Sequence, residues 1–450
     1  MHTQALKMKQ LFGCCLVAFA TLFASTNSSA LPSYARQTGQ ECASCHVGSF
    51  GPQLTPYGQR FKIEGYVESN GESSVPISEM AVVTYASTKK DLPEGAGPYD
   101  KSNNNASLQE LSLFGAGRIT DHIGMFAQVT YSDVERKTSL DNVDIRFATQ
   151  TKLFDKDATI GVSVNNNPTI QDAFNTTPGW RFPYTSSQLA PKPAAAPLID
   201  GGLEQQVIGA SAYAFLDDRW FAELGLYRSL STSFLDKVGL AANARLDASA
   251  PYWRLAYRRD LKSRAFSIGA FGLSAKLDPN RSNGETNNYT DIGIDGNYQY
   301  LGNRSNVYTI DTSYIHEKQT NNYFYAEDEA SNRGGHLNQF NLAASWYLQK
   351  TYGLNARYFS TTGNGDKKLY AENPVDGSRV GSPNSRGFTW QVDYTPWGKE
   401  DSWNSPWANL RLGLQYTMYS KFNGASNDYD GDGRRARDNN TLYLFAWQAF

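Results

Sequence analysis

The chain has 450 residues, of which 40% are hydrophobic and 13% aromatic, and its formal net charge at pH 7 is −2. Its mean hydropathy is −0.52. Beyond the N-terminal stretch no run of about 20 apolar residues occurs, which excludes a bundle of membrane-spanning helices. The near-neutral charge and the lack of a basic run argue against nucleic acid as a partner.

The first 30 residues have the pattern of a secretory leader. A basic start precedes the apolar run Leu11–Ala24, which is followed by a polar stretch of small residues. We expect cleavage before Leu31. The apolar run is too short for a transmembrane anchor, which needs about 20 residues. Two of the four cysteines leave with the leader, so the mature chain contains only Cys42 and Cys45.

Cys42, Cys45 and His46 form a C-x-x-C-H motif, a pattern that suits a redox disulfide, half of a zinc site or covalent haem attachment. A structural zinc site needs about four ligands, and the mature chain has no further thiol and no paired-histidine motif. A thioredoxin-type disulfide would lie in a βαβ pattern, which is missing here. In a c-type haem both thiols add to the vinyl groups and the adjacent histidine binds the iron. The motif therefore predicts one covalent haem c on Cys42 and Cys45, with His46 as the proximal iron ligand.

Residues 31–77 are predicted to form a small helical haem segment. One helix is expected, with Thr55 as its N-cap, a proline at the first position and Gly65 just past its end. Tyr57 and Phe61 are four residues apart and share a face that suits packing on the porphyrin, with packing on protein as the alternative. At roughly 45 residues the segment is near the limit of about 40 residues below which a chain rarely buries a core unaided. We therefore expect something larger to shelter the haem.

Residues 78–450 alternate between apolar and polar side chains. The stretches Ile123–Ser132, Trp220–Ser229 and Asn409–Ser420 show this most clearly. About sixteen such runs of roughly ten residues occur, which is the length and pattern of transmembrane β-strands. The sequence thus predicts an all-β transmembrane barrel of about 16 antiparallel strands, with Arg411 and Glu223 facing a polar interior.

Connections between these strands alternate in length once the first strand is placed at about Ser78–Ser87. Asp217–Asp218 is one of the short ones, and 166–202 is one of the long ones, with a stiff, irregular stretch at 190–197. Outer-membrane barrels have short periplasmic turns and long outer loops. The last residue, Phe450, suits the C-terminal signal of bacterial outer-membrane proteins. We expect an outer-membrane protein surrounded by lipid, and a secreted sandwich or propeller is the alternative.

The stretch Ala35–Tyr66, followed by an aromatic-rich barrel, resembles the fused monohaem cytochrome–porins, the family of outer-membrane iron-oxidising cytochromes. The resemblance implies that the haem segment plugs or caps the barrel. It implies extracellular Fe(II) as the electron donor and a periplasmic cytochrome or another electron carrier as the acceptor. Cys42, Cys45 and His46 match the family's haem residues. Such a protein is of the oxidoreductase type, and no catalytic residue is assigned.

Two other functions remain open from the sequence. The protein could be a passive porin in which the haem is structural or regulatory. It could also be a haem enzyme such as a peroxidase, which needs an open iron position and distal acid/base groups. Reduction of the haem by extracellular Fe(II) distinguishes the first of these from an iron-oxidising cytochrome. The acidic stretch Asp428–Gly433 is expected to be an outer loop that attracts cations.

The distal iron ligand is the least determined site residue. The candidates in the mature chain are Met80, His122, Met125, His316, His336 and Met418. Met125 and Met418 have the lipid-facing parity of their strands, and the three histidines fall in a periplasmic turn or beside an outer loop. Met80 directly follows the haem segment. We expect Met80 to be the distal ligand, with an ordinary core or lipid-facing role as the alternative.

Overall fold

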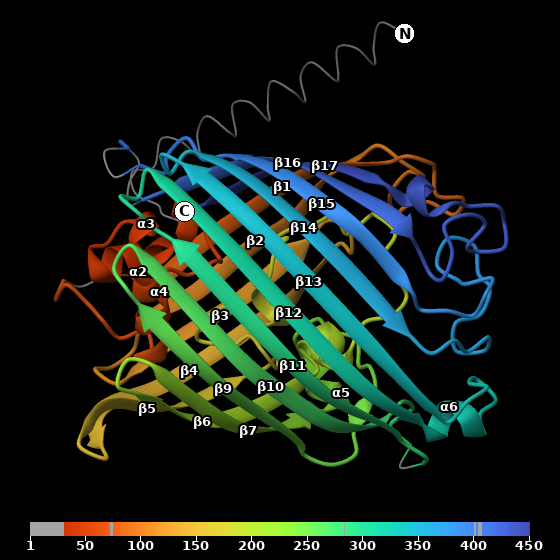
Figure 1. Ribbon diagram of the computed structural model, residues 1–450, viewed down its shortest axis with the longest axis horizontal. Helices are drawn as coiled ribbons and strands as arrows, with labels where there is room; N and C mark the ends of the chain where they lie inside the picture. Colours follow the sequence, from red (N-terminus) through yellow and green to blue (C-terminus); the bar gives the residue numbers. More distant parts are fainter. Residues whose placement is uncertain (1–30, 73–74, 283, 400–401, 404–406) are drawn as a thin grey trace, which may run out of the picture.

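The computed structural model describes residues 31–450 except 73–74, 283, 400–401 and 404–406. The predicted leader and its cleavage site precede these residues. Within the described residues, seventeen strands form one antiparallel sheet that closes on itself, because β1 pairs with both β2 and β17. One of them, β8, has only two residues, so sixteen strands build the barrel wall (Figure 1). The predicted fold class is confirmed.

In chain order the strands are β1 (Ile77–Thr88), β2 (Asn105–Arg118), β3 (Ile123–Ser132), β4 (Lys137–Leu153), β5 (Lys156–Asn165), β6 (Val207–Leu216), β7 (Trp220–Ser229), β8 (Arg245–Leu246), β9 (Ala250–Asp260), β10 (Arg264–Asp278), β11 (Asn287–Tyr300), β12 (Asn306–Asn321), β13 (Gly334–Leu348), β14 (Tyr352–Gly363), β15 (Ser385–Tyr394), β16 (Asn409–Lys421) and β17 (Thr441–Ala449). The helices are α2 (Pro32–Thr38), α3 (Cys42–Cys45), α4 (Pro56–Ile63), α5 (Thr232–Lys237) and α6 (Asn322–Ala326), and the short helical turns are η1 (Val47–Ser49), η2 (Pro178–Trp180), η3 (Leu198–Gly202) and η4 (Ala436–Asn439). No helix in the described part of the chain is long and apolar enough to cross a bilayer.

The wall has apolar residues outside and polar residues inside. On β7, Leu224 and Leu226 are 71% and 58% exposed, whereas Glu223, on the opposite face of the strand, is only 2% exposed. On β16, Arg411 is 1% exposed and Leu414 is 46% exposed. This is the reverse of a soluble protein, and it is the pattern of a barrel whose outer face contacts lipid. The predicted inward positions of Glu223 and Arg411 are confirmed.

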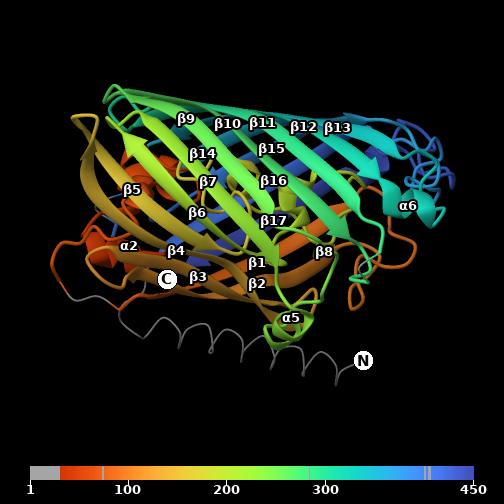
Figure 2. The same cartoon turned by 90° about the horizontal axis from the view of Figure 1, so that it is seen from below.

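Most connections follow the expected alternation. Short turns such as 154–155, 217–219 and 349–351 lie at the end of the barrel that holds α2–α4 and the C-terminus, and α6 lies at the opposite end (Figures 1 and 2). In outer-membrane barrels the short turns face the periplasm. Two connections depart from the alternation: residues 133–136 make a short outer turn, and the periplasmic connection between β15 and β16 is a longer one.

The expected outer loop at 166–202 instead turns back into the barrel. We call this connection between β5 and β6, residues 166–206, the lumen loop. The guanidinium of Arg254 on β9 pairs with Asp172 of the loop at 3.0 Å. Thr176 Oγ1–H donates to Asp295 on β11 at 2.6 Å. The loop folds inward because charged side chains of the wall satisfy its polar groups.

Candidate functional site

The N-terminal segment (residues 31–76) lies inside the periplasmic end of the barrel. Hydrogen bonds join it to nine strands around the wall: β1, β2, β3, β4, β6, β9, β11, β12 and β16. For example, Gln299 Nε2–H donates to Leu54 O at 2.7 Å, and Asn409 Nδ2–H donates to Ser49 O at 2.7 Å. The segment therefore plugs the barrel.

Helix α4 has the predicted ends and holds the C-x-x-C-H turn in place. Thr55 Oγ1 accepts from Gly58 N at 3.3 Å and donates to the Ser44 carbonyl. Gly65, with φ +79°, follows the helix in the left-handed region that favours glycine. A Cβ at Gly58 would lie 2.3 Å from the Cys45 carbonyl oxygen. Only glycine lets α4 pack this closely against the motif.

Cys42 and Cys45 are both free thiols, and each is half-buried. Burial raises the pKa of Cys42 to about 11 and that of Cys45 to about 12. Redox-active cysteines in C-x-x-C motifs have lowered pKa values instead. Burial also lowers the pKa of His46 to about 4, so its imidazole is neutral at pH 7. The donor set is thus two protonated thiols and one neutral imidazole.

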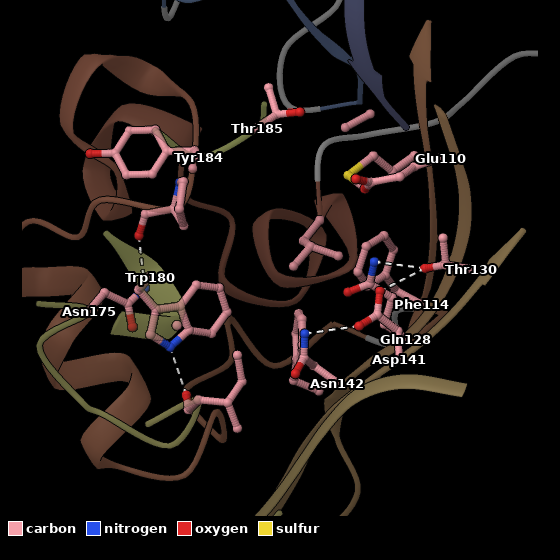
Figure 3. A pocket seen from close by; sticks show the side chains of 18 of the residues that line it. Glu110, Phe114, Gln128, Thr130, Asp141, Asn142, Asn175, Trp180, Tyr184 and Thr185 are labelled. Carbon is pink, nitrogen blue, oxygen red and sulfur yellow. Dashed lines mark hydrogen bonds between the residues drawn. The ribbon is translucent and has the colours of Figure 1, made fainter. Parts of the chain in front are cut away.

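A cavity of about 960 Å³ opens beside the motif, and Cys42, Cys45 and His46 all line it. This volume is within the range of about 300–1,000 Å³ that is typical of ligand and cofactor sites. The cavity lies between the wall, where Phe114 and Gln128 face it, and the lumen loop (Figure 3). Other apolar walls come from Phe61, Phe126 and Trp447.

These residues fit a haem c. Two thiols stand at the spacing that thioether attachment needs. His46 Nδ1 is buried without a hydrogen-bond partner, so the imidazole has unused ligand capacity. The apolar walls suit a porphyrin face. Phe61 lines the cavity as predicted, but Tyr57 does not, because its hydroxyl donates to Glu68 Oε1 at 2.8 Å.

Met80 faces the same cavity. It is 8% exposed on the inward face of β1 and belongs to the apolar cluster that contains Phe50, Phe61 and Phe114. A lipid-facing role is therefore wrong for Met80, and its binding to iron stays a prediction. The remaining candidates, His122, Met125, His316, His336 and Met418, do not line the cavity.

Lys62 and Trp180 join the N-terminal segment to the lumen loop, and the sequence analysis missed both. Lys62 Nζ–H donates to Ile170 O at 2.8 Å and to Asn175 Oδ1 at 2.9 Å. Its ammonium also lies 4.5 Å from the centre of the Trp180 ring. Lys62 lies in the last turn of α4, where a lysine usually faces water, so no local signal reveals these contacts.

No protein-family model matches the chain, and no curated protein matches it. Among solved structures, the chain is similar to an anion-selective porin from Comamonas acidovorans, at 12% identity over 84% of this chain and 99% of the porin, with a TM-score of 0.47. It is similar to the outer membrane channel DcaP of Acinetobacter baumannii at 12% identity, over 85% and 99% of the two chains, with a TM-score of 0.46. OmpT of Vibrio cholerae matches at 10% identity, over 84% and 98%, with a TM-score of 0.43. At these scores the comparisons add nothing on function. The chain's own closed sheet, turns and lipid-facing side chains make it a porin-like β-barrel of the bacterial outer membrane.

Proposed function

We propose that the protein is an outer-membrane electron-transfer cytochrome. It takes electrons from an extracellular donor, Fe(II), and passes them to a periplasmic cytochrome or another carrier. The observation that carries this proposal is the cavity inside the barrel that Cys42, Cys45, His46 and Met80 line together. One haem c at this site supplies reversible one-electron chemistry when bound.

The chain's own residues have separate roles in this proposal. Cys42 and Cys45 hold the group by two thioether bonds. His46 offers a neutral imidazole nitrogen, and Met80 brings a thioether sulfur to the same cavity. Phe61 and Phe114 are 5% and 4% exposed. They limit the access of water, which is one way a protein tunes a reduction potential.

Electron transfer suits a barrel that is closed at the periplasmic end. Hydrogen bonds to nine strands hold the N-terminal segment in the lumen, where it obstructs the passage of a solute. Ferric iron is nearly insoluble at neutral pH, and a cell gains by leaving the oxidised product outside.

A passive porin with a structural or regulatory haem is the second candidate. The porin-like fold and the cavity in the lumen favour it. The plug opposes it, because an open pore needs a continuous aqueous path. For a peroxidase, which needs distal acid/base groups, the cavity offers carboxylates but no histidine other than His46 among the described lining residues, and no observation favours it over the other two.

Stopped-flow mixing of the purified haem-bearing protein with Fe(II), read at the Soret band, tests the proposal. We expect Fe(II) to reduce the haem on the stopped-flow timescale. The haem should be reoxidised when an oxidised c-type cytochrome is added. The same preparation in a planar bilayer should show conductance far below that of an open porin. A haem that dithionite reduces and Fe(II) leaves oxidised, together with porin-like conductance, would establish the passive porin instead.

A further inference from the structure

The cavity beside the motif continues to the outer end of the barrel. Its lining includes Val134 and Glu135 of the β3–β4 turn and Leu240 and Ala241 of the β7–β9 connection, both at the outer end. The β7–β9 connection meets β4 just after that turn, because Leu140 N–H of β4 donates to Val238 O at 2.9 Å. One hollow therefore extends from the outer mouth to Cys42.

We infer that this lumen channel is the entry route of the electron donor, and that the donor is a small dissolved cation. The inference rests on the proposed function and names the substrate class of the same site. A donor such as aqueous Fe(II) gives up one electron and becomes Fe(III). The electron ends on the oxidised periplasmic carrier, and a haem held by Cys42, Cys45 and His46 would supply the one-electron relay between the two. The oxidised cation returns by the outer mouth, since the plug closes the other end.

The dimensions of the channel limit the size of the donor. The whole channel, from the mouth to the motif, has a volume of about 960 Å³. The lumen loop occupies lumen space beside it. Trp180, 6.2 Å from Phe126 between ring centres, stands between the loop and the wall at this point. A mineral particle or a protein cannot reach the motif by this path, whereas a hydrated ion can.

The charges along the channel favour a cation. Glu110 on β2, Asp141 on β4 and Glu204 of the lumen loop all line it. None of the three forms an ion pair with a described residue. Asp141 is held by hydrogen bonds from Thr130 Oγ1–H at 2.9 Å and Gln205 Nε2–H at 2.7 Å. Rings of carboxylates from different elements are what cation channels use for selectivity.

Most basic side chains of the lining are already engaged. Lys137 pairs with Glu135 at 2.7 Å, and Arg181 pairs with Asp200. Lys62 donates to two oxygens of the lumen loop. Lys192 is the remaining cation in the described lining, and it offsets one of the three carboxylates. The channel thus keeps an excess of negative charge near its middle.

Crowding of these carboxylates has an energetic consequence. Burial, and after it the charges of Asp141 and Asp200, raises the pKa of Glu204 to about 7. A passing cation relieves this repulsion. A narrow, low-dielectric cleft lined by one sign of charge raises the local concentration of counter-ions. Their association rate rises by roughly 10- to 1,000-fold.

A first experiment measures access without using the haem. Gln128→Cys places a reporter thiol in the channel lining on β3, beside Thr130, which donates to Asp141, and the motif's own thiols are bound as thioethers. We expect a cationic methanethiosulfonate to react on the order of tenfold faster than an anionic one. The ratio should fall to near one when Glu110→Gln, Asp141→Asn and Glu204→Gln are combined. A triple variant at exposed outer-loop carboxylates (Glu327→Gln, Glu329→Gln and Asp432→Asn) removes the same charge and should keep the ratio.

A second variant tests the route. Ala241→Trp narrows the outer mouth and should slow both reagents alike. Unchanged rates in that variant, or an unchanged charge preference in the channel triple variant, would overturn the inference.

A third measurement links the channel to the haem. Aqueous Fe(II) is a cation, whereas its EDTA complex is an anion and a stronger reductant. Wild-type haem should be reduced faster by the aqueous ion, and the channel triple variant should reverse that order with unchanged haem content. If the haem is reduced at rates that do not depend on the charge of the donor, the channel inference is wrong and the proposed function stands. If the thiol reaction is charge-selective but Fe(II) does not reduce the haem, the channel is cation-selective and the proposed function is wrong.

Discussion

At the scale of single residues, the motif is what the sequence predicts best. The spacing of Cys42, Cys45 and His46 is a local property, and the structure places all three on one cavity. Met80 required a guess from chain position, because its strand is apolar on both sides, and the inward orientation comes only from the closed sheet. The fate of Tyr57 was not predictable, because its partner Glu68 lies beyond the helix.

Met80→His tests the distal ligand. If Met80 binds the iron, the substitution should abolish the weak sulfur-to-iron charge-transfer band of the oxidised protein. It should also lower the reduction potential by roughly 0.1–0.3 V, part of the range of about 0.8 V that axial ligands set, because a thioether favours Fe(II) over Fe(III) more than an imidazole does. Met418→Leu, on the lipid-facing parity, is the control and should change neither quantity. A Met80→His protein with wild-type spectrum and potential would exclude Met80.

At the scale of elements, the N-terminal segment, the lumen loop and the wall meet at Arg146 on β4. Its side chain is 1% exposed. It donates to Lys62 O at 3.1 Å, to the Gln171 carbonyl and to Asp144 Oδ2 at 2.8 Å. The predicted capping of α4 was correct because caps are local. The inward fold of the lumen loop was not predicted, because the wall residues that hold it, Arg254 among them, are distant in sequence.

Arg146→Met should loosen the plug. It leaves Asp144 as a buried unpaired charge, and breaking a buried pair by removing one partner costs about 3–5 kcal/mol. The urea concentration at which residues 31–76 become protease-sensitive should fall. Adding Asp144→Asn removes the stranded charge and should restore part of the loss. Equal protection in the single variant and the wild type would show that this contact does not hold the plug.

Gly58→Ala should displace α4 from the motif. The added Cβ would lie 2.3 Å from the Cys45 carbonyl oxygen, and overpacking of this kind costs roughly 1–3 kcal/mol. We expect a lower yield of covalent haem per chain and a lower thermal midpoint for the segment. Gly334→Ala is the matched control, because a Cβ there meets no atom within 4 Å. Full haem content in the Gly58→Ala protein would mean that α4 does not position the motif.

At the scale of the whole molecule, the alternation of side chains was sufficient to predict the barrel. Successive side chains of a strand point to opposite faces, so Leu224 and Leu226 face out and Glu223 faces in, independently of the neighbouring strands. β1 pairs antiparallel with β17 to close the sheet, which is possible because the wall has an even number of strands. The lumen channel could not be predicted, since its walls come from strands, the N-terminal segment and the lumen loop together.

Closure of the sheet predicts heat-modifiable migration. A closed barrel leaves no unpaired strand edge for detergent to open, so the protein should stay folded in SDS and migrate differently until boiled. It should also fractionate with outer membranes, because its outer face is apolar. Recovery as a soluble periplasmic protein, with one migration before and after boiling, would contradict the barrel.

The central claim is that the plug inside this barrel carries a covalent haem. The most direct measurement is the intact mass of the mature chain, purified from cells that attach c-type haems, beside a Cys42→Ala/Cys45→Ala double variant. We expect the wild-type chain to exceed its polypeptide mass by one haem, and the double variant, still folded and heat-modifiable, to have the bare polypeptide mass. A wild-type chain with the mass of the bare polypeptide would contradict the account.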